Sequence, residues 1–517
     1  MTRKARHDYL RREGGILLHP TSLPGPHGIG DLGVEARRFV DFLESSGLGL
    51  WQMLPLGPVG YGNSPYAARS AMAGNPLLIS LEVLAKEGYL SADDLAPGHE
   101  LPAGYVDYDA VAAFKLPLLR QAYQRFLGTA TEPERSEFAN FCQRNAPWLE
   151  DYALYMALRD AHRGADWLHW DPDVATRRPE ALESCRRQLA DEVRFQQFTQ
   201  FQFHRQWAVL KRYANERGIR IVGDVPIFVA LDSADVWSRP ELFHLDEKGR
   251  PTVVAGVPPD YFSKTGQRWG NPLYRWDLMA RDGYRWWVER FRATLTQVDM
   301  VRIDHFRGFQ AYWEVPAHHK TAERGRWVEG PGEALFRALE AALGPLSVIA
   351  EDLGLITPDV EALRLKLGFP GMKVLQFAFG ENARNPYLPH NYERRYVVYT
   401  GTHDNDTTVG WFASRSPRER QAVLRYLGTG GKEIHWDMIR LAFASVADAA
   451  IVPLQDVLGL GSWARMNTPG LPKGNWTWRL APGQLTEEHS RRLRDLAVTY
   501  GRTEEPTATC SGPRSSE

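Results

Sequence analysis

The chain has 517 residues, with 62 basic and 63 acidic side chains and a net charge of −1. This length suits one large barrel with insertions or two to four smaller domains. The balanced charge argues against a broad binding surface for nucleic acid or for an acidic membrane.

The ends and the cysteines indicate where the protein works. Residues 1–13 form a basic, polar arm with no apolar run behind it, and no stretch approaches the roughly 18 apolar residues of a membrane span. The three cysteines are far apart and fit neither a disulfide framework nor a zinc site. We therefore expect a cytoplasmic protein with reduced thiols, no signal peptide and no membrane partner.

Short apolar runs alternate with helical patterns along the chain. The predicted strands are Ile16–Leu18, Trp51–Leu54, Ile219–Val222, Met300–Asp304, Ser347–Ala350, Lys373–Phe377, Tyr396–Tyr399 and Ala450–Leu454. The predicted helices between and after them include Val34–Ser46, Asp191–Arg217, Tyr284–Leu295, Glu333–Leu343 and Thr486–Tyr500. Eight such units predict an α/β fold, a (β/α)₈ TIM barrel over residues 14–502. An open doubly wound sheet is the alternative for the same pattern.

Two long connections predict insertions after the second and third strands. Residues of about 80–200 look mainly helical, above all in Tyr108–Leu127 and Glu134–Arg163. Residues of about 236–276 are rich in Gly, Pro and aromatics, and we expect loops there that lie over the mouth of the barrel. The last residues, 503–517, are rich in Thr, Ser, Pro and Glu, which predicts a disordered tail.

A glycine motif near the N-terminus does not indicate dinucleotide binding. Gly28, Gly30 and Gly33 match the GxGxxG spacing after a strand and before a helix. A dinucleotide site needs a tight turn directly after the strand and an acid after the second strand. Neither is present, so we interpret the motif as a loop with unusual backbone angles.

Three acidic residues fall at or just after the ends of strands four, five and seven, where barrel enzymes carry their active sites: Asp304, Glu351 and Asp404. Period-2 alternation places Val301 and Ile303 against the outer helices, and Arg302 and Asp304 inside the barrel. Acids that converge in a barrel mouth repel one another, so such clusters are usually retained for chemistry.

Glycosyl transfer with retention requires these residue types. One carboxylate attacks the anomeric carbon, and one carboxylic acid protonates the leaving oxygen before acting as a base. In this mechanism the two carboxyl groups stand about 5–5.5 Å apart. Arg302 beside Asp304 favours an ionised nucleophile, and the apolar residues before Glu351 favour a protonated acid. The next residue, His305, points away from Asp304 in this alternation, and we expect a structural histidine with satisfied hydrogen bonds.

These motifs resemble those of the α-amylase superfamily, in which Arg-x-Asp, a strand-five Glu and His-Asp carry the chemistry. One element differs, because the strand-three motif of amylases ends in Asn-His, whereas the corresponding stretch here, Gly223–Val229, has no histidine. This departure is typical of amylomaltases, the 4-alpha-glucanotransferases. Further stretches similar to that family are Gly15–Pro24, Tyr61–Tyr66, Pro258–Ser263, Gly266–Pro272, Arg465–Gly470 and Gly474–Trp476. The resemblance extends from about Gly14 to about Tyr500.

The resemblance implies a role for each matching position. Asp304 would be the nucleophile, Glu351 the acid/base and Asp404 the stabiliser. The implied substrate-binding residues are Arg302, His403, Asp224, Tyr66, Ser64 and Tyr61, with Gln267 and Trp269 on the acceptor side. Aromatic faces together with carboxylates and amides suit the apolar faces and hydroxyl rims of sugars.

The predicted function is the transfer of a segment of an α-1,4-glucan to glucose or to another glucan. Maltooligosaccharides and α-1,4-glucans would be donor and acceptor, and the resemblance implies no cofactor. We expect no metal site and a monomer or weak homodimer. A retaining hydrolase of the α-amylase type is the alternative, since the acids alone do not distinguish transfer from hydrolysis. A non-catalytic glucan-binding protein is a third hypothesis, which the presence of all three acids disfavours.

Overall fold

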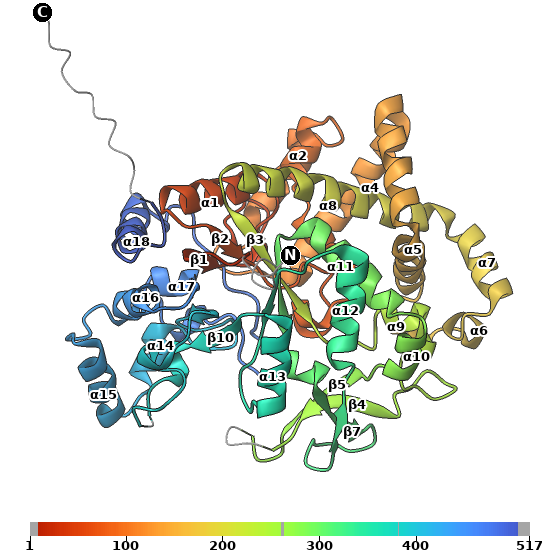
Figure 1. Ribbon diagram of the computed structural model, residues 1–517. Helices are drawn as coiled ribbons and strands as arrows, with labels where there is room; N and C mark the ends of the chain where they lie inside the picture. The colour runs from red at the N-terminus through yellow and green to blue at the C-terminus, as the bar shows by residue number, and fades with distance from the viewer. Residues whose placement is uncertain (1–8, 260–262, 381, 505–517) are drawn as a thin grey trace, which may run out of the picture.

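A barrel of parallel strands forms the centre of the fold (Figure 1). The structure, a computed structural model, describes residues 9–259, 263–380 and 382–504, and within these ranges eight strands make up the barrel. They are β1 (Glu13–Leu17), β2 (Leu50–Gln52), β3 (Arg220–Pro226), β6 (Met300–Asp304), β9 (Val348–Ala350), β10 (Gly371–Val374), β11 (Tyr396–Tyr399) and β12 (Ala449–Pro453). The predicted (β/α)₈ barrel is confirmed.

The strand order is β10, β11, β12, β1, β2, β3, β6, β9. The two ends of this order meet, because the Ala350 N–H donates to the carbonyl of Pro370, just before β10, at 2.9 Å. Each predicted strand overlaps one of these strands. The sixth begins and ends earlier than predicted, since Leu375–Phe377 turns into a 3-10 helix.

The two faces of each barrel strand meet different partners, as the period-2 alternation predicts. Val222 and Met300 pack inside the barrel with Leu17, Leu50 and Ile349. The alternate residues of β6, Val301 and Ile303, belong instead to the outer core between strands and helices. The polar residues of β3 and β6 therefore lie inside the barrel together with a layer of apolar side chains, which forms its floor.

Helices cover the outside of the barrel (Figure 1). Those that the sequence predicts are α1 (Val34–Ser45), α8 (Ala190–Glu216), α11 (Arg285–Gln297), α12 (Gly332–Leu343) and α18 (Glu487–Thr499). The others are α13 (Pro358–Leu367), α14 (Thr408–Ala413), α15 (Pro417–Leu427), α16 (Ile434–Ala444) and α17 (Leu454–Val457). This second group of helices was not predicted from the sequence.

The chain between β2 and β3 is largely helical. It contains α2 (Leu81–Lys86), α3 (Ala92–Leu95), α4 (Tyr108–Thr129), α5 (Glu132–Ala161), α6 (Pro172–Ala175) and α7 (Pro179–Gln188) ahead of α8. In Figure 1, α4, α5, α6 and α7 gather on one side of the barrel. Asp232, after β3, ties this segment to the mouth by accepting from Arg159 and Arg69, each at 2.7 Å, and from Tyr155 at 2.6 Å.

A second, antiparallel sheet lies beside the barrel, and two of its four strands fall within residues 236–276, for which the sequence predicts loops. Its strands are β5 (Gln267–Pro272), β4 (Val253–Val257), β7 (Ala311–Pro316) and β8 (Arg326–Glu329), in that order. Within residues 236–276 the structure has the strands β4 and β5 in place of loops; the short helix α9 (Ala234–Ser238) overlaps the start of this segment, and α10 (Trp276–Arg281) begins at its last residue. Because β7 follows β6, this sheet joins two separate connections of the barrel.

Two arginines near the limits of the described chain, Arg12 and Arg502, contact the floor of the barrel, where β1 begins. Arg502 donates to the carbonyls of Phe443 at 2.8 Å and of Glu13, the first residue of β1, at 3.1 Å. Arg12 donates to the carbonyls of Tyr500 at 2.9 Å and Ser445 at 3.0 Å. The predicted arm and tail fall mostly on residues 1–8 and 505–517, outside the described residues.

The glycine motif after β1 serves the backbone. Gly28 has a φ of 73°, which favours glycine, and a Cβ on Gly30 would lie 2.1 Å from the carbonyl oxygen of Pro20.

No helix in the described ranges is both long and apolar enough to span a membrane. The same ranges contain no group of three or more His, Cys, Asp or Glu side chains placed to hold a metal ion.

Candidate active site

The register between β3 and β6 places the first charged residues of the site. Asp224 pairs with Arg302, and Pro226 pairs with Asp304. Arg302 is buried and donates from Nη1 to Asp224 Oδ2 at 2.6 Å and from Nη2 to Asp304 Oδ1 at 3.0 Å. One guanidinium thus bridges two carboxylates, each at the carboxyl end of its strand.

Burial and charge oppose each other in this group. Burial alone would lower the pKa of Arg302, but Asp224 and Asp304 together raise it well above its ordinary value. Burial raises the pKa of the Asp224 carboxyl, and the Arg302 guanidinium opposes that shift. Arg302 is therefore held as a cation, and it organises the carboxylates around it.

Glu351 follows β9 and is held by two backbone N–H groups. His305 donates to Oε2 at 2.7 Å and Leu353 donates to Oε1 at 2.8 Å. Burial, and after it the charge of Asp304, raises the pKa of Glu351 to about 8. At neutral pH the Glu351 carboxyl is therefore mainly protonated, as a proton donor requires.

Tyr66 and His403 connect the Arg302 group to the end of β11. The Tyr66 hydroxyl donates to Asp224 Oδ2 at 2.7 Å and lies 3.3 Å from His403 Nδ1. The two rings stack with their centroids 4.9 Å apart. His403 Nε2 in turn lies 3.4 Å from Asp404 Oδ1. Polar contacts thus run from Asp304 through Arg302, Asp224, Tyr66 and His403 to Asp404.

Two residues that were not predicted as site residues, Asn467 and Trp476, also hold this group. Asn467 donates from Nδ2 to Asp404 Oδ1 at 2.6 Å. Trp476 lies beside Tyr66 and His403, with ring centroids 5.8 Å and 5.9 Å away. Both belong to stretches that resemble the amylomaltase family, which is the signal that could have identified them.

The predicted acceptor-side residues lie on β5. Gln267 and Trp269 are exposed, and the Trp269 Nε1 donates to Gln267 Oε1 at 3.2 Å. The Trp269 ring meets the His305 ring edge to face at 4.7 Å, next to Asp304. The expectation that His305 is hydrogen-bonded is wrong for Nε2, which is buried without a hydrogen-bond partner among the described residues.

The two remaining predicted residues lie on the loop after β2. Ser64 accepts from the Tyr66 N–H at 3.2 Å, so its hydroxyl caps the turn that carries Tyr66. Tyr61 is 81% exposed, and no contact joins it to the central group. The structure therefore brings Asp224, Arg302, Asp304, Glu351, Tyr66, His403 and Asp404 together, places Trp269 and Gln267 beside them, and leaves Tyr61 outside.

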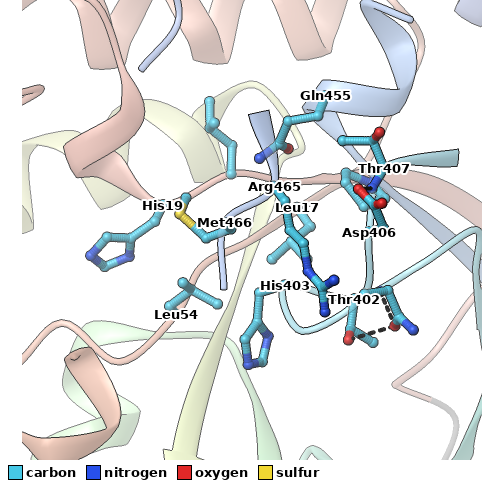
Figure 2. A pocket seen from close by; sticks show the side chains of 13 residues that line it. Leu17, His19, Leu54, Thr402, His403, Asp406, Thr407, Gln455, Arg465 and Met466 are labelled. Carbon is cyan, nitrogen blue, oxygen red and sulfur yellow. Dashed lines mark hydrogen bonds between the residues drawn. The ribbon is translucent and has the colours of Figure 1, made fainter. Parts of the chain in front are cut away.

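A cavity of about 420 Å³ adjoins this group at the ends of β1, β11 and β12. Figure 2 shows polar side chains of Thr402, His403, Asp406, Gln455 and Arg465 around it. Such a lining offers both donors and acceptors of hydrogen bonds, as sugar hydroxyls require.

A family comparison identifies the enzyme class. The sequence model of the family described as 4-alpha-glucanotransferase matches residues 18–486. The chain belongs to the 4-alpha-glucanotransferase family. The 4-alpha-glucanotransferase of Thermus thermophilus is 56% identical over 496 residues, which cover 94% of this chain and 98% of that protein. The one from Synechocystis is 55% identical over 95% of this chain and 98% of its own length.

Solved structures agree with the family assignment. The amylomaltase from Streptococcus agalactiae, in complex with acarbose, superposes with a TM-score of 0.93 at 38% identity, covering 96% of this chain and 100% of that one. The amylomaltase from Corynebacterium glutamicum, at 20% identity and a TM-score of 0.78 over 94% of this chain and 75% of its own, supports the fold. The predicted amylomaltase resemblance is confirmed, and the hydrolase alternative is not favoured.

Proposed function

We propose that Asp304 and Glu351 of this 4-alpha-glucanotransferase act as nucleophile and acid/base in a retaining double displacement on α-1,4-glucans. The contrast between the two carboxyls carries the proposal. Asp304 is paired with the Arg302 guanidinium at 3.0 Å, while the pKa of Glu351 is raised to about 8. One group is thus suited to attack carbon and the other to donate a proton.

The first half of the reaction breaks the glucan. Asp304 attacks C1 of the donor sugar while Glu351 gives its proton to the glycosidic oxygen, and the reducing-end fragment leaves. The product is a glycosyl ester of Asp304 and an ionised Glu351. In the second half, Glu351 takes the proton from the 4-hydroxyl of the acceptor. That oxygen attacks C1, Asp304 is released, and a new α-1,4 bond replaces the old one.

The remaining charges suit the oxocarbenium-like transition state. Asp404, fixed by Asn467 at 2.6 Å, would stabilise positive charge on the ring and orient its hydroxyls. Asp224 and Tyr66, joined at 2.7 Å, would bind further hydroxyls of the same sugar, with Arg302 and His403 beside them. Ser64 would contact the donor side together with Tyr66, and Tyr61 would guide a longer glucan farther out.

Transfer requires that sugar reach the ester before water. The β4–β5 hairpin brings Trp269, which donates to Gln267, next to His305, where an acceptor sugar can stack on the indole. Such a platform favours a sugar over water at C1, so we assign the acceptor side to this hairpin. Maltooligosaccharides, glucose and longer α-1,4-glucans would be the acceptors.

Product analysis with maltotriose alone tests the activity. Transfer predicts glucose together with longer oligosaccharides at a nearly constant number of reducing ends, whereas an amylase-type hydrolase would raise that number steadily. Asp304→Asn should abolish turnover and leave maltotriose binding measurable. Undiminished turnover in that variant would exclude the assigned nucleophile, and binding without turnover in the parent protein would support a non-catalytic glucan-binding protein.

We also propose that the enzyme is cytoplasmic and a monomer or weak homodimer. Cys142 and Cys185 are free thiols, which is typical of a reducing compartment. Light scattering at several protein concentrations would measure the oligomeric state, and a stable larger assembly would contradict that part of the proposal.

A further inference from the structure

His305 follows Asp304 in the chain and contacts Glu351 through its backbone N–H, and its backbone has an unusual conformation. Its φ and ψ are 54° and 49°, the left-handed region that non-glycine residues seldom adopt. This conformation turns the His305 N–H towards Glu351 Oε2, at 2.7 Å. Strain of this kind persists where the surrounding structure enforces it, and it concentrates at functional sites.

The backbone around His305 and Glu351 is tightly joined. The Glu351 N–H donates to the carbonyl of Ile303 at 3.0 Å, and the Phe306 N–H donates to the carbonyl of Glu351 at 3.2 Å. Together with the hydrogen bond from the His305 N–H, these contacts join Glu351 to the segment from Ile303 to Phe306. A shift of residue 305 would therefore change the direction of the Glu351 carboxyl.

The side chain of His305 faces the opposite partner, the β4–β5 hairpin. Its ring meets Trp269 edge to face at 4.7 Å. Space for the ring depends on Gly308, since a Cβ at that position would lie 3.1 Å from His305 Cδ2. The buried Nε2 has no hydrogen-bond partner in the described part of the chain, so ring packing rather than a polar bond sets the ring's place.

We propose that His305 is a positioning residue that couples the acceptor-side hairpin to the proton-transfer group, through its ring on Trp269 and its backbone N–H on Glu351. The inference rests on the proposed roles of Trp269 and Glu351. An acceptor sugar stacked on Trp269 fixes the indole, the indole fixes the imidazole, and Glu351 is then held where it removes the acceptor's proton. The coupling acts on the second half-reaction, in which the acceptor is present.

A donor with a good leaving group separates the two half-reactions. Maltotriosyl fluoride loses fluoride without needing a proton from Glu351, so the first burst of fluoride reports the attack by Asp304 alone. Added glucose then reports the acceptor step. Two variants of the full-length protein test His305: H305N removes the ring with a residue that tolerates the left-handed conformation, and H305F keeps an aromatic ring.

In H305N we expect a fluoride burst within twofold of the parent rate and a kcat/KM for glucose about 2- to 12-fold lower, the worth of one aromatic pair. H305F should retain the parent value. When H305N is added to W269A, the kcat/KM for glucose should fall no further than in W269A alone. H305G, in which glycine adopts the conformation freely, gives the same comparison if H305N does not fold.

An equal loss in the burst and in the acceptor step would overturn the coupling, and so would additive losses in the double variant or an unchanged glucose kcat/KM in H305N. Failure of the proposed function is recognised separately, because D304N would then still release fluoride in a burst.

Discussion

Replacing Arg302 by methionine should destabilise the protein and abolish its activity. The guanidinium is 4% exposed and its Nη1 lies 2.6 Å from Asp224 Oδ2, whose side chain is fully buried. Removing one partner of a buried ion pair leaves an uncompensated charge and costs about 3–5 kcal/mol. For a chain of 517 residues this corresponds to a fall in Tm of about 3–5 °C.

A second substitution distinguishes this explanation from lost packing. R302M/D224N removes the stranded charge as well, so most of the lost Tm should return while activity stays absent. The deficit of R302M should also shrink as the pH is lowered, because protonated carboxyls need no counter-charge. Thermal unfolding followed by circular dichroism measures all three proteins. The reasoning is refuted if R302M unfolds at the parent temperature, or if D224N restores none of the loss.

Three further predictions follow from the site and its surroundings. The pKa of Glu351 is raised from its ordinary value of 4.5 to about 8, so kcat/KM should fall as the pH rises through about 8. Between about pH 4.5 and about pH 8 the folded protein carries a proton on Glu351 that the unfolded chain has lost. The free energy of unfolding of the parent should therefore fall relative to that of E351Q over this pH range, and parallel Tm curves would contradict this. Asn467→Ala removes a hydrogen bond to the Asp404 carboxylate and should lower kcat/KM about 10- to 150-fold at unchanged Tm, and normal rates on maltotriose would refute its role. Lys115 is fully buried, donates to the carbonyl of Leu77 at 2.7 Å and lies 3.9 Å from Asp31. Lys115→Met should therefore lower the free energy of unfolding by about 3 kcal/mol, measured by denaturant titration. An unchanged midpoint would show that this ion pair contributes little.

The barrel could be predicted from the sequence because its strands are short apolar runs with clear alternation. Val301 and Ile303 face the helices while Arg302 and Asp304 face inward, so the sequence of this strand alone indicates which residues point out of the barrel and which point into it. The three acids could be located for the same reason, since each stands where a strand ends. The apolar residues before Glu351 indicated a protonated acid, but the size of its pKa shift could not be predicted, because it depends on burial in the folded barrel and on Asp304, which is distant in sequence.

The second sheet could not be predicted from local pattern. Its strands β4 and β5 contain Gly256 and Gly270, and β5 is mostly exposed, so neither shows a buried alternating face. Pairing with β7, from another connection of the barrel, supplies the stability that the local sequence lacks. The sequence does contain signals for both ends of helix α13. Pro358 is its first residue, and Gly368 ends it with a φ of 73°.

The arginines at the barrel floor determine how the enzyme can be attached to other molecules. Arg12 and Arg502 hold the start of β1 and the end of α18 against neighbouring carbonyls, on the face opposite the carboxylates. A tag, a fused domain or a linker to a solid support at either terminus would therefore leave the mouth open to long polymers. Since Arg12 and Tyr500 are joined by a hydrogen bond of 2.9 Å, connecting these two segments with a short peptide and opening the chain at an exposed turn should also give an active circular permutant.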